Sequence, residues 1–226
     1  MLTAGLSAIQ SIIPMESKQL KPKSGGKKPN AKKDEILNVA AGLFLKFGYK
    51  GTSVNEMARC SGISKETIYR HFKSKRKLFS EVLDKELQHY QGEPGYVIDP
   101  GEHADTRKAL KQYGKMLLNI LLEKRTLGLR GLIFLESAVH PELGTLYYDL
   151  GPRRGYQVLE EYFDMRLKHG MKSRFDARKL SRYFAALVLY NVMLEYQCGV
   201  KRTISEQELD GHVDEVVDDF ISLYIK

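Results

Sequence analysis

A tight reversal at residues 61–63 constrains the fold of this chain more than any other feature. It consists of Ser61-Gly62-Ile63, with Ala58 four residues before the glycine and Ile68 six residues after it. The glycine can adopt the positive φ that a tight turn requires, and a small residue such as Ala58 lets two helices cross closely. The spacing predicts a helix-turn-helix, with helices over about 53–60 and 64–70.

The second helix of this motif has the surface of a recognition helix. Ser64 is a suitable N-cap, because its hydroxyl can accept a hydrogen bond from a backbone N–H of the first turn. Ile68 fits the core that Met57 and Ile63 share. The outer positions hold polar, charged and aromatic residues, namely Lys65, Glu66, Thr67, Tyr69, Arg70 and His71. Such a helix is shaped to enter the major groove of duplex DNA.

The order of residue types from residue 34 to residue 83 is also distinctive. It contains Ile36-Leu37, Ala40-Ala41, Leu43-Phe44, Gly48-Tyr49, Thr52-Ser53, Met57-Ala58, Gly62-Ile63-Ser64, Thr67-Ile68-Tyr69, His71-Phe72 and Ser74-Lys75. Over this ungapped stretch the chain resembles the N-terminal domain of TetR-family transcriptional regulators. The resemblance implies an all-helical homodimer that binds palindromic DNA and releases it when a small molecule enters the C-terminal domain.

The net charge of +8 is concentrated in the N-terminal part of the chain. The first eighty residues carry +11, and the remaining 146 carry −3. A charge that served only solubility would be spread more evenly, so the asymmetry indicates nucleic-acid binding. Residues 1–32 are predicted to be a disordered basic extension, which either follows DNA or acts only as a solubilising tail. Met15 is a candidate natural start, in which case residues 1–14 derive from an upstream start codon.

The rest of the sequence predicts helices and no strands. The expected helices run over about 33–47, from Ser74 to before Gly92, over 105–122 and 127–139, from Pro141 to a break at 151–152, and over 156–169, 176–198 and 205–224. The expected fold is therefore all-α, with about nine helices. Residues 33–80 form the helix-turn-helix DNA-binding domain, and residues 81–226 form a helical domain for effector binding and dimerisation.

Several classes of protein are disfavoured. Cys60 and Cys198 lie far apart without ligand-like spacing, so neither a disulfide framework nor a metal site is expected, which suits the cytoplasm. No apolar run is long enough to span a membrane. The sequence contains no Gly-x-Ser-x-Gly, no phosphate-cradling glycine loop and no His-Glu-x-x-His, so we expect neither a catalytic site nor a cofactor. A transcriptional activator, or a constitutive DNA-binding protein without an effector, remains an alternative to a repressor.

The candidate DNA contacts divide into two groups. The first turn of the recognition helix, mainly Lys65 and Thr67, is placed to contact bases, and Arg70 could reach either a base or a phosphate. Helix N-termini attract phosphate, which adds the positions near the starts of three helices. In the TetR-family pattern, Thr52, Ser53, Tyr69, His71 and Lys75 hold the DNA backbone. The full expected set is Thr52, Ser53, Ser64, Lys65, Thr67, Tyr69, Arg70, His71 and Lys75.

An effector pocket is expected in the second domain. Eleven of the thirteen tyrosines lie at or beyond residue 90, and their rings and hydroxyls could line and orient an apolar ligand, although ordinary core packing is the alternative. The segments Gly131–Glu136, His140–Leu143 and Gly151–Arg154 resemble the C-terminal domain of the AefR-like branch. The candidate contacts are Phe134, Glu136, His140, Tyr147, Tyr183, Tyr190 and Asn191.

The last two helices carry apolar residues on more than one face. Within 176–198, the side chains of Leu187, Leu189, Val192 and Met193 cannot all point into one core. The surplus is expected to pack against the same helices of a second subunit, forming a two-fold four-helix interface. Such a homodimer requires an operator with inverted repeats.

Overall fold

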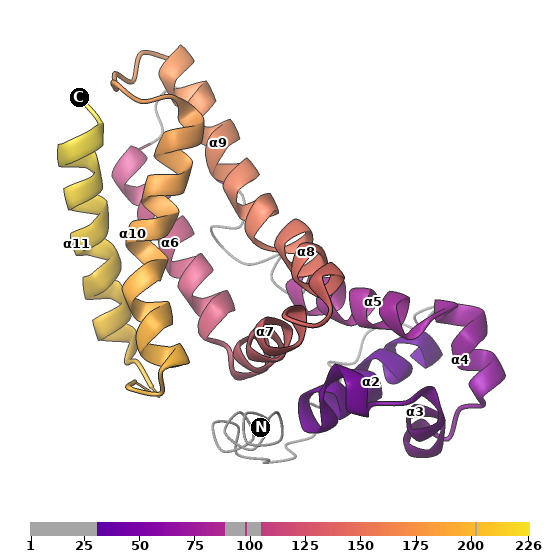
Figure 1. The fold of residues 1–226 in the computed structure, drawn as a ribbon. Coiled ribbons are helices and arrows are strands. Elements are labelled where there is room, and N and C mark those ends of the chain that lie inside the picture. Colours follow the sequence, from indigo (N-terminus) through magenta and orange to yellow (C-terminus); the bar gives the residue numbers. More distant parts are fainter. Residues whose placement is uncertain (1–30, 89–97, 99–104, 202) are drawn as a thin grey trace. The chain divides into compact units, whose positions relative to one another are not determined.

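All regular structure in the described part of the chain is helical. The computed structural model describes residues 31–88, 98, 105–201 and 203–226, so nearly all of the expected extension over residues 1–32 lies outside the described residues. The all-α prediction is confirmed (Figure 1). The chain divides into two compact units, one formed by residues 1–86 and 128–146 and the other by residues 87–127 and 147–226.

The first unit contains the helix-turn-helix. Its helices are α2 (Ala31–Gly51), α3 (Val54–Ser61), α4 (Lys65–Phe72) and α5 (Lys75–Gln88), together with most of α7 (Lys124–Ser137) and the first part of α8 (Pro141–Leu150). Part of the segment expected to form the effector domain therefore packs with the DNA-binding motif. Leu129, Leu132 and Ile133 of α7 are buried there, so burial of apolar side chains stabilises this packing.

An aromatic and aliphatic core holds the helices of the first unit together. Phe44 and Phe79 are fully buried and meet edge to face, with ring centroids 4.9 Å apart. Met57, Ile68 and Phe72 close the same core from α3 and α4, and each is no more than 1% exposed. Because both short helices are anchored through these residues, their remaining faces are held in a defined orientation.

Local signals set the ends of these helices as the sequence predicts. Gly48 has φ 76° and ψ 170°, so the regular turns of α2 stop there, and Gly62 turns the chain between α3 and α4 with φ 67°. The hydroxyls of Ser53, Ser64 and Ser74 each accept a hydrogen bond from the backbone N–H three residues later, at 3.1–3.2 Å. Each serine thus satisfies a donor that a helix start would leave unpaired.

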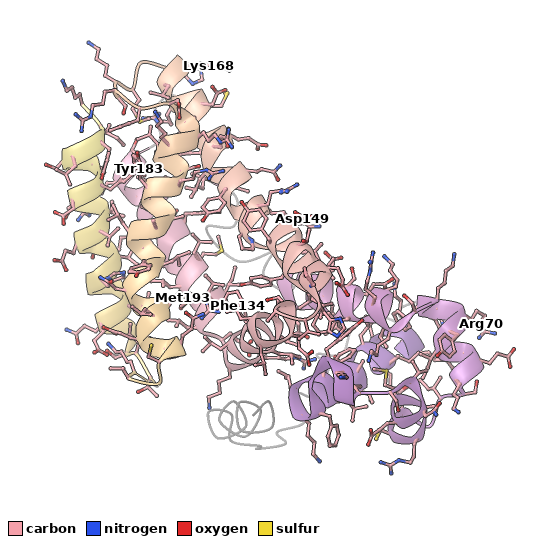
Figure 2. All side chains as sticks on the ribbon, viewed as in Figure 1. Arg70, Phe134, Asp149, Lys168, Tyr183 and Met193 are labelled. Carbon is pink, nitrogen blue, oxygen red and sulfur yellow. The ribbon has the colours of Figure 1, made fainter. Side chains whose placement is uncertain are left out.

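The second unit is built from α6 (Thr106–Leu122), α9 (Pro152–Lys168), α10 (Ala177–Gln197) and α11 (Glu206–Tyr224), with the end of α8. Helix α10 packs against α6, α9 and α11 (Figure 1), and Figure 2 labels Tyr183 and Met193 along it. The core includes Leu110, Tyr113, Leu159, Tyr162, Phe163, Phe184, Val188, Val213, Val217 and Phe220. A Cβ at Gly114 would lie only 3.1 Å from a methyl of Val213, so the glycine allows α6 and α11 to approach closely.

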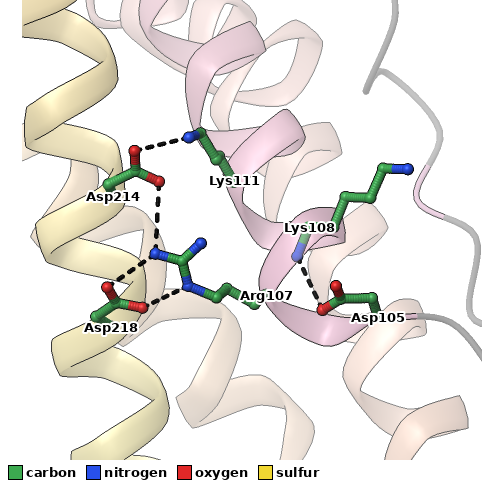
Figure 3. A network of polar contacts seen from close by, with 6 residues as sticks. All are labelled: Asp105, Arg107, Lys108, Lys111, Asp214 and Asp218. Atoms are coloured by element: carbon green, nitrogen blue, oxygen red, sulfur yellow. Dashed lines mark hydrogen bonds and ion pairs between the residues drawn. The ribbon is translucent and has the colours of Figure 1, made fainter.

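A ladder of ion pairs joins α6 to α11 along their exposed edge (Figure 3). The Arg107 guanidinium donates to both carboxylate oxygens of Asp218 at 2.6 and 2.9 Å, and Lys111 donates to Asp214 at 2.7 Å. Lys115 pairs with Asp210 further along. The hydrogen bond from Arg107 holds the pKa of Asp218 below its usual range. The cations recur every four residues on α6 and the acids every four on α11, so both rows lie on single helix faces.

We expect Gly62, in the turn between α3 and α4, to tolerate substitution poorly. Gly62→Ala places a Cβ at φ 67° and should lower the free energy of unfolding by about 1 kcal/mol. Gly42→Ala is the matched control, because Gly42 is exposed within α2 and nothing lies within 4 Å of an added Cβ. This control should instead raise the free energy of unfolding, by up to about 1 kcal/mol. Urea denaturation of both variants measures the effects, and changes of the same sign would contradict the interpretation.

Candidate nucleic-acid interface

The outer face of α4 is the most open part of the helix-turn-helix. Lys65, Glu66, Tyr69 and Arg70 are exposed, and Tyr69 shows half of its surface to solvent. Figure 2 labels Arg70 on this helix. The opposite face carries buried apolar residues that face the core. The sequence-predicted recognition residues are therefore brought together on one surface, at the spacing that a helix face requires.

The positive charge of this surface is not neutralised internally. Within the part of the chain that the structure describes, Lys65, Arg70, Lys73 and Arg76 form no ion pair with an acidic side chain. Lys77 does, at 3.7 Å from Glu81. Exposed cations that are held in no ion pair can each bind an anionic partner directly.

The first turn of α4 is organised by Ser64. Its hydroxyl accepts from the Thr67 backbone N–H at 3.2 Å and lies 2.9 Å from the Thr67 hydroxyl. Thr67 and His71 are half-buried, and the His71 ring lies 6.0 Å from the Phe72 ring at a tilt of 48°. Both residues therefore lie at the edge of the exposed face, where a side chain can contact the core and a ligand.

Of the two hydroxyls expected at the start of α3, only one is available at the surface. Ser53 is exposed. Thr52 is 1% exposed, and its hydroxyl donates to the backbone oxygens of Leu43 at 3.0 Å and Gly48 at 2.8 Å. Thr52 thus ties the start of α3 to the last turns of α2 through two backbone carbonyls. The side chain does not point outward as a phosphate contact requires.

The Lys75 side chain binds mainly within the first unit and is only secondarily a surface cation. Its Nζ donates to the backbone oxygens of Tyr49 at 2.9 Å and Thr52 at 3.2 Å, and lies 4.5 Å from the centre of the Tyr49 ring. Desolvation lowers the pKa of Lys75, and the carboxylate of Glu136 opposes this shift. An ammonium group has three N–H donors, so two bonds to carbonyls leave one for an outside partner.

Two residues expected at the effector site lie in the first unit, beside the end of α2. Glu136 accepts from the backbone N–H groups of Tyr49 at 3.0 Å and Lys50 at 3.3 Å, although 87 and 86 residues separate them. His140 lies with its ring centre 5.7 Å from that of Tyr49, and its Nδ1 is 3.5 Å from Glu142. Glu136 and His140 thus both contact the end of α2, a placement that no spacing in the sequence indicates.

The other expected effector contacts do not lie in one interior. Phe134 on α7 is 51% exposed, and Tyr147 on α8 is half-buried. Tyr183, Tyr190 and Asn191 are exposed on α10. Among the described tyrosines of the second unit, Tyr113 and Tyr162 are buried, and the hydroxyl of Tyr113 donates to the Gly155 backbone oxygen at 2.8 Å. These two are core residues, which is the alternative role foreseen for tyrosines in this domain.

The described residues contain no cluster of three or more histidine, cysteine, aspartate or glutamate side chains that could hold a metal ion. Cys60 and Cys198 are exposed thiols. Outside the segments that the structure leaves undescribed, no helix combines the length and the apolar character needed to cross a bilayer.

Known proteins resemble this chain in both parts. Residues 36–82 match the model of bacterial regulatory proteins of the tetR family, and residues 108–226 match that of the AefR-like transcriptional repressor C-terminal domain. QacR of Staphylococcus aureus is 46% identical over 59 residues, which cover 26% of this chain and only 31% of QacR. The regulator YhgD of Bacillus subtilis is 28% identical over 144 residues, 63% of this chain and 70% of YhgD.

Solved structures extend the similarity to the whole fold. A TetR-family regulator from Mesorhizobium loti shares 28% identity with a TM-score of 0.75, covering 88% of this chain and 99% of that one. The flavonoid-responsive regulator FrrA shares 26% identity with a TM-score of 0.70, covering 85% and 96%. These relatives are transcriptional regulators and not enzymes. With its helix-turn-helix and its AefR-like C-terminal domain, the chain belongs to the TetR family of transcriptional regulators.

Proposed function

We propose that this regulator is a repressor that binds a palindromic operator as a homodimer and leaves it when a small apolar molecule binds. The observation that carries DNA binding is the outer face of α4, where exposed cations have no acidic partner among the described residues and the opposite face is anchored in the core. Repression is proposed because several relatives carry that description, including KstR2 and ComR. Such a regulator would act in the cytoplasm, on chromosomal DNA, without catalysis or a cofactor.

The proposed DNA contacts follow from exposure. Lys65 and Thr67 lie in the first turn of α4 and are assigned to base edges in the major groove. Tyr69, Arg70 and His71, with the helix starts at Ser53 and Ser64, are assigned to phosphates and adjacent groups. Thr52 is assigned a supporting role, and Lys75 has at most one N–H for a phosphate.

The proposed dimer surface is an apolar stripe on α10. Tyr183, Leu187, Tyr190 and Leu194 follow one another at intervals of four, three and four residues, and are 38–67% exposed. Of the residues expected to form the interface, Leu187 lies in this stripe, whereas Val192 and Met193 are buried in the core of their own unit. A contiguous exposed apolar stripe on a helix is suited to a matching helix of a second subunit.

The effector is proposed to be an apolar, aromatic molecule. FrrA, which covers nearly the same length at 26% identity, is described as flavonoid-responsive, so flavonoids are the natural first probes. Tyr183 and Tyr190 also belong to the α10 stripe, so an effector and a second subunit would share or compete for them. Phe134, Tyr147 and Asn191 remain proposed contacts. A ligand controls DNA affinity only if it binds the two states of the dimer unequally.

The recognition face predicts two kinds of DNA-binding defect. Lys65→Ala should change preference at particular base pairs by about 1–3 kcal/mol, because base contacts carry sequence information. Arg70→Ala and Tyr69→Ala should weaken binding to all sequences, and Arg70→Ala should reduce the salt dependence by about one phosphate contact. Binding to duplexes selected from a random library, at several salt concentrations, measures both. Arg178→Ala, which removes an exposed cation from α10, is the control and should bind as wild type.

The α10 stripe predicts the oligomeric state. Leu187→Glu and Tyr190→Glu place charges in the proposed interface and should convert the dimer to a monomer at micromolar concentration in sedimentation. Met165→Glu on α9 changes a residue of similar exposure outside the stripe and should stay dimeric. A wild-type protein that sediments as a monomer would exclude this interface.

The effector proposal predicts linked stability and DNA release. A flavone, a flavanone and an isoflavone are tested first; a ligand at a hundred times its Kd should stabilise the fold by about 2.7 kcal/mol, seen as a higher Tm. The same compounds should weaken operator binding by about fivefold or more. Stabilising compounds that leave operator affinity unchanged would favour a constitutive regulator, and a reporter gene in cells would separate repression from activation.

A further inference from the structure

We propose that Glu136 of α7 is a positioning residue for DNA binding, because it holds in place the connection between α2 and α3. This inference rests on the proposed function. We call residues 48–53 the α2–α3 junction. Helix α3 begins directly after it, at Val54, and leads through the Gly62 turn to α4. Any displacement of the junction is therefore passed to the recognition helix.

Glu136 acts on the backbone of the junction. Its Oε1 accepts from the N–H groups of Tyr49 and Lys50 at 3.0 and 3.3 Å, and the first of these bonds is partly buried. Gly48 has left the helical conformation, so these N–H groups have no regular helical partner that a continuing α2 would supply. A carboxylate that accepts from two backbone N–H groups makes stronger bonds than a neutral acceptor.

The same short stretch is held from its other side by a positive charge. Lys75 donates to the Tyr49 and Thr52 carbonyl oxygens, at 2.9 and 3.2 Å. Tyr49 is thus bound through its N–H to a carboxylate on α7 and through its C=O to an ammonium on α5. Its side chain is 8% exposed, with the rings of Phe79 and His140 at 5.2 and 5.7 Å. The carboxylate, the ammonium group and the packed rings therefore hold the junction in the same conformation.

Helix α7 gives this contact a place in regulation. Residues 124–127 of the helix belong to the second unit, and Glu136 follows about three turns later within the first. A shift or rotation of α7 caused by a ligand in the second unit would reach the junction through Glu136.

The electrostatic effect of Glu136 on DNA has the opposite sign to its positioning effect. Removing a carboxylate near a DNA-binding surface strengthens attraction for phosphates. Removing the acceptor that holds the junction weakens binding, because the recognition helix is no longer fixed. Glu142→Ala is the control for removal of a carboxylate: this exposed residue is in α8, and its contact is with the His140 side chain rather than with a backbone N–H of the junction.

The experiment compares wild type, Glu136→Ala, Glu136→Gln and Glu142→Ala on a duplex selected from a random library by the wild-type protein. Glu136→Ala should weaken binding by about tenfold, because the N–H groups of Tyr49 and Lys50 lose the acceptor that fixes the junction. Glu136→Gln keeps an oxygen that accepts from N–H and should bind within about threefold of wild type. Glu142→Ala should bind as tightly as wild type or more tightly. The salt dependence should not change in any variant, because no phosphate contact is removed.

Amide hydrogen exchange distinguishes a local loosening of the junction from a loss of overall stability. The N–H groups of Tyr49 and Lys50 should lose protection in Glu136→Ala, with the buried core of α2 unchanged and the Tm within a few degrees of wild type. Equal or tighter binding by Glu136→Ala, or equal weakening by Glu136→Ala and Glu136→Gln, would overturn the role of Glu136. A wild-type protein that selects no sequence would overturn the proposed function itself.

Discussion

The organisation of the first unit depends on how the backbone of Tyr49 is bound. Its N–H meets the Glu136 carboxylate and its C=O meets the Lys75 ammonium, at 3.0 and 2.9 Å. Peptide groups that leave a helix must find partners, and here charged side chains from two other helices supply them. The cost of partly burying these charges is offset because each is bound to groups that complement it. The end of α2, the start of α5 and helix α7 are thereby joined at a single residue.

This arrangement separates the residues that support the DNA-binding surface from those that form it. Thr52 and Lys75 direct their polar groups to backbone carbonyls, whereas Lys65, Tyr69 and Arg70 are exposed on α4. The hydrogen bonds of a supporting polar group inside a compact unit are strong because they are shielded from water. A surface cation is weakly held and adaptable, which suits a partner that arrives and leaves.

Local signals in the sequence predict most of the fold. Gly62 at positive φ, the serine caps and the break at Gly48 depend on neighbours within a few residues, so residue type and spacing suffice. The hydrogen bond between Tyr49 and Glu136 joins residues 87 positions apart, and no residue pattern in the sequence predicts it. The inward turn of Thr52 depends on where α2 ends. On α10, Val192 is buried and Leu187 is exposed although both are apolar. The packing of α6, α9 and α11 determines which face of α10 is buried.

The ion-pair ladder between α6 and α11 is compatible with more than one alignment of the two helices, whereas the close contact at Gly114 is not. Cations at 107, 111 and 115 and acids at 210, 214 and 218 repeat with the same interval, so sliding one helix by a turn, about 6 Å, would still pair two of the three rungs. The close contact between Gly114 and Val213 has no such repeat, because an added Cβ would lie 3.1 Å from the methyl at this one position. Charge thus keeps these helices attached over a range of alignments, and steric fit selects one among them.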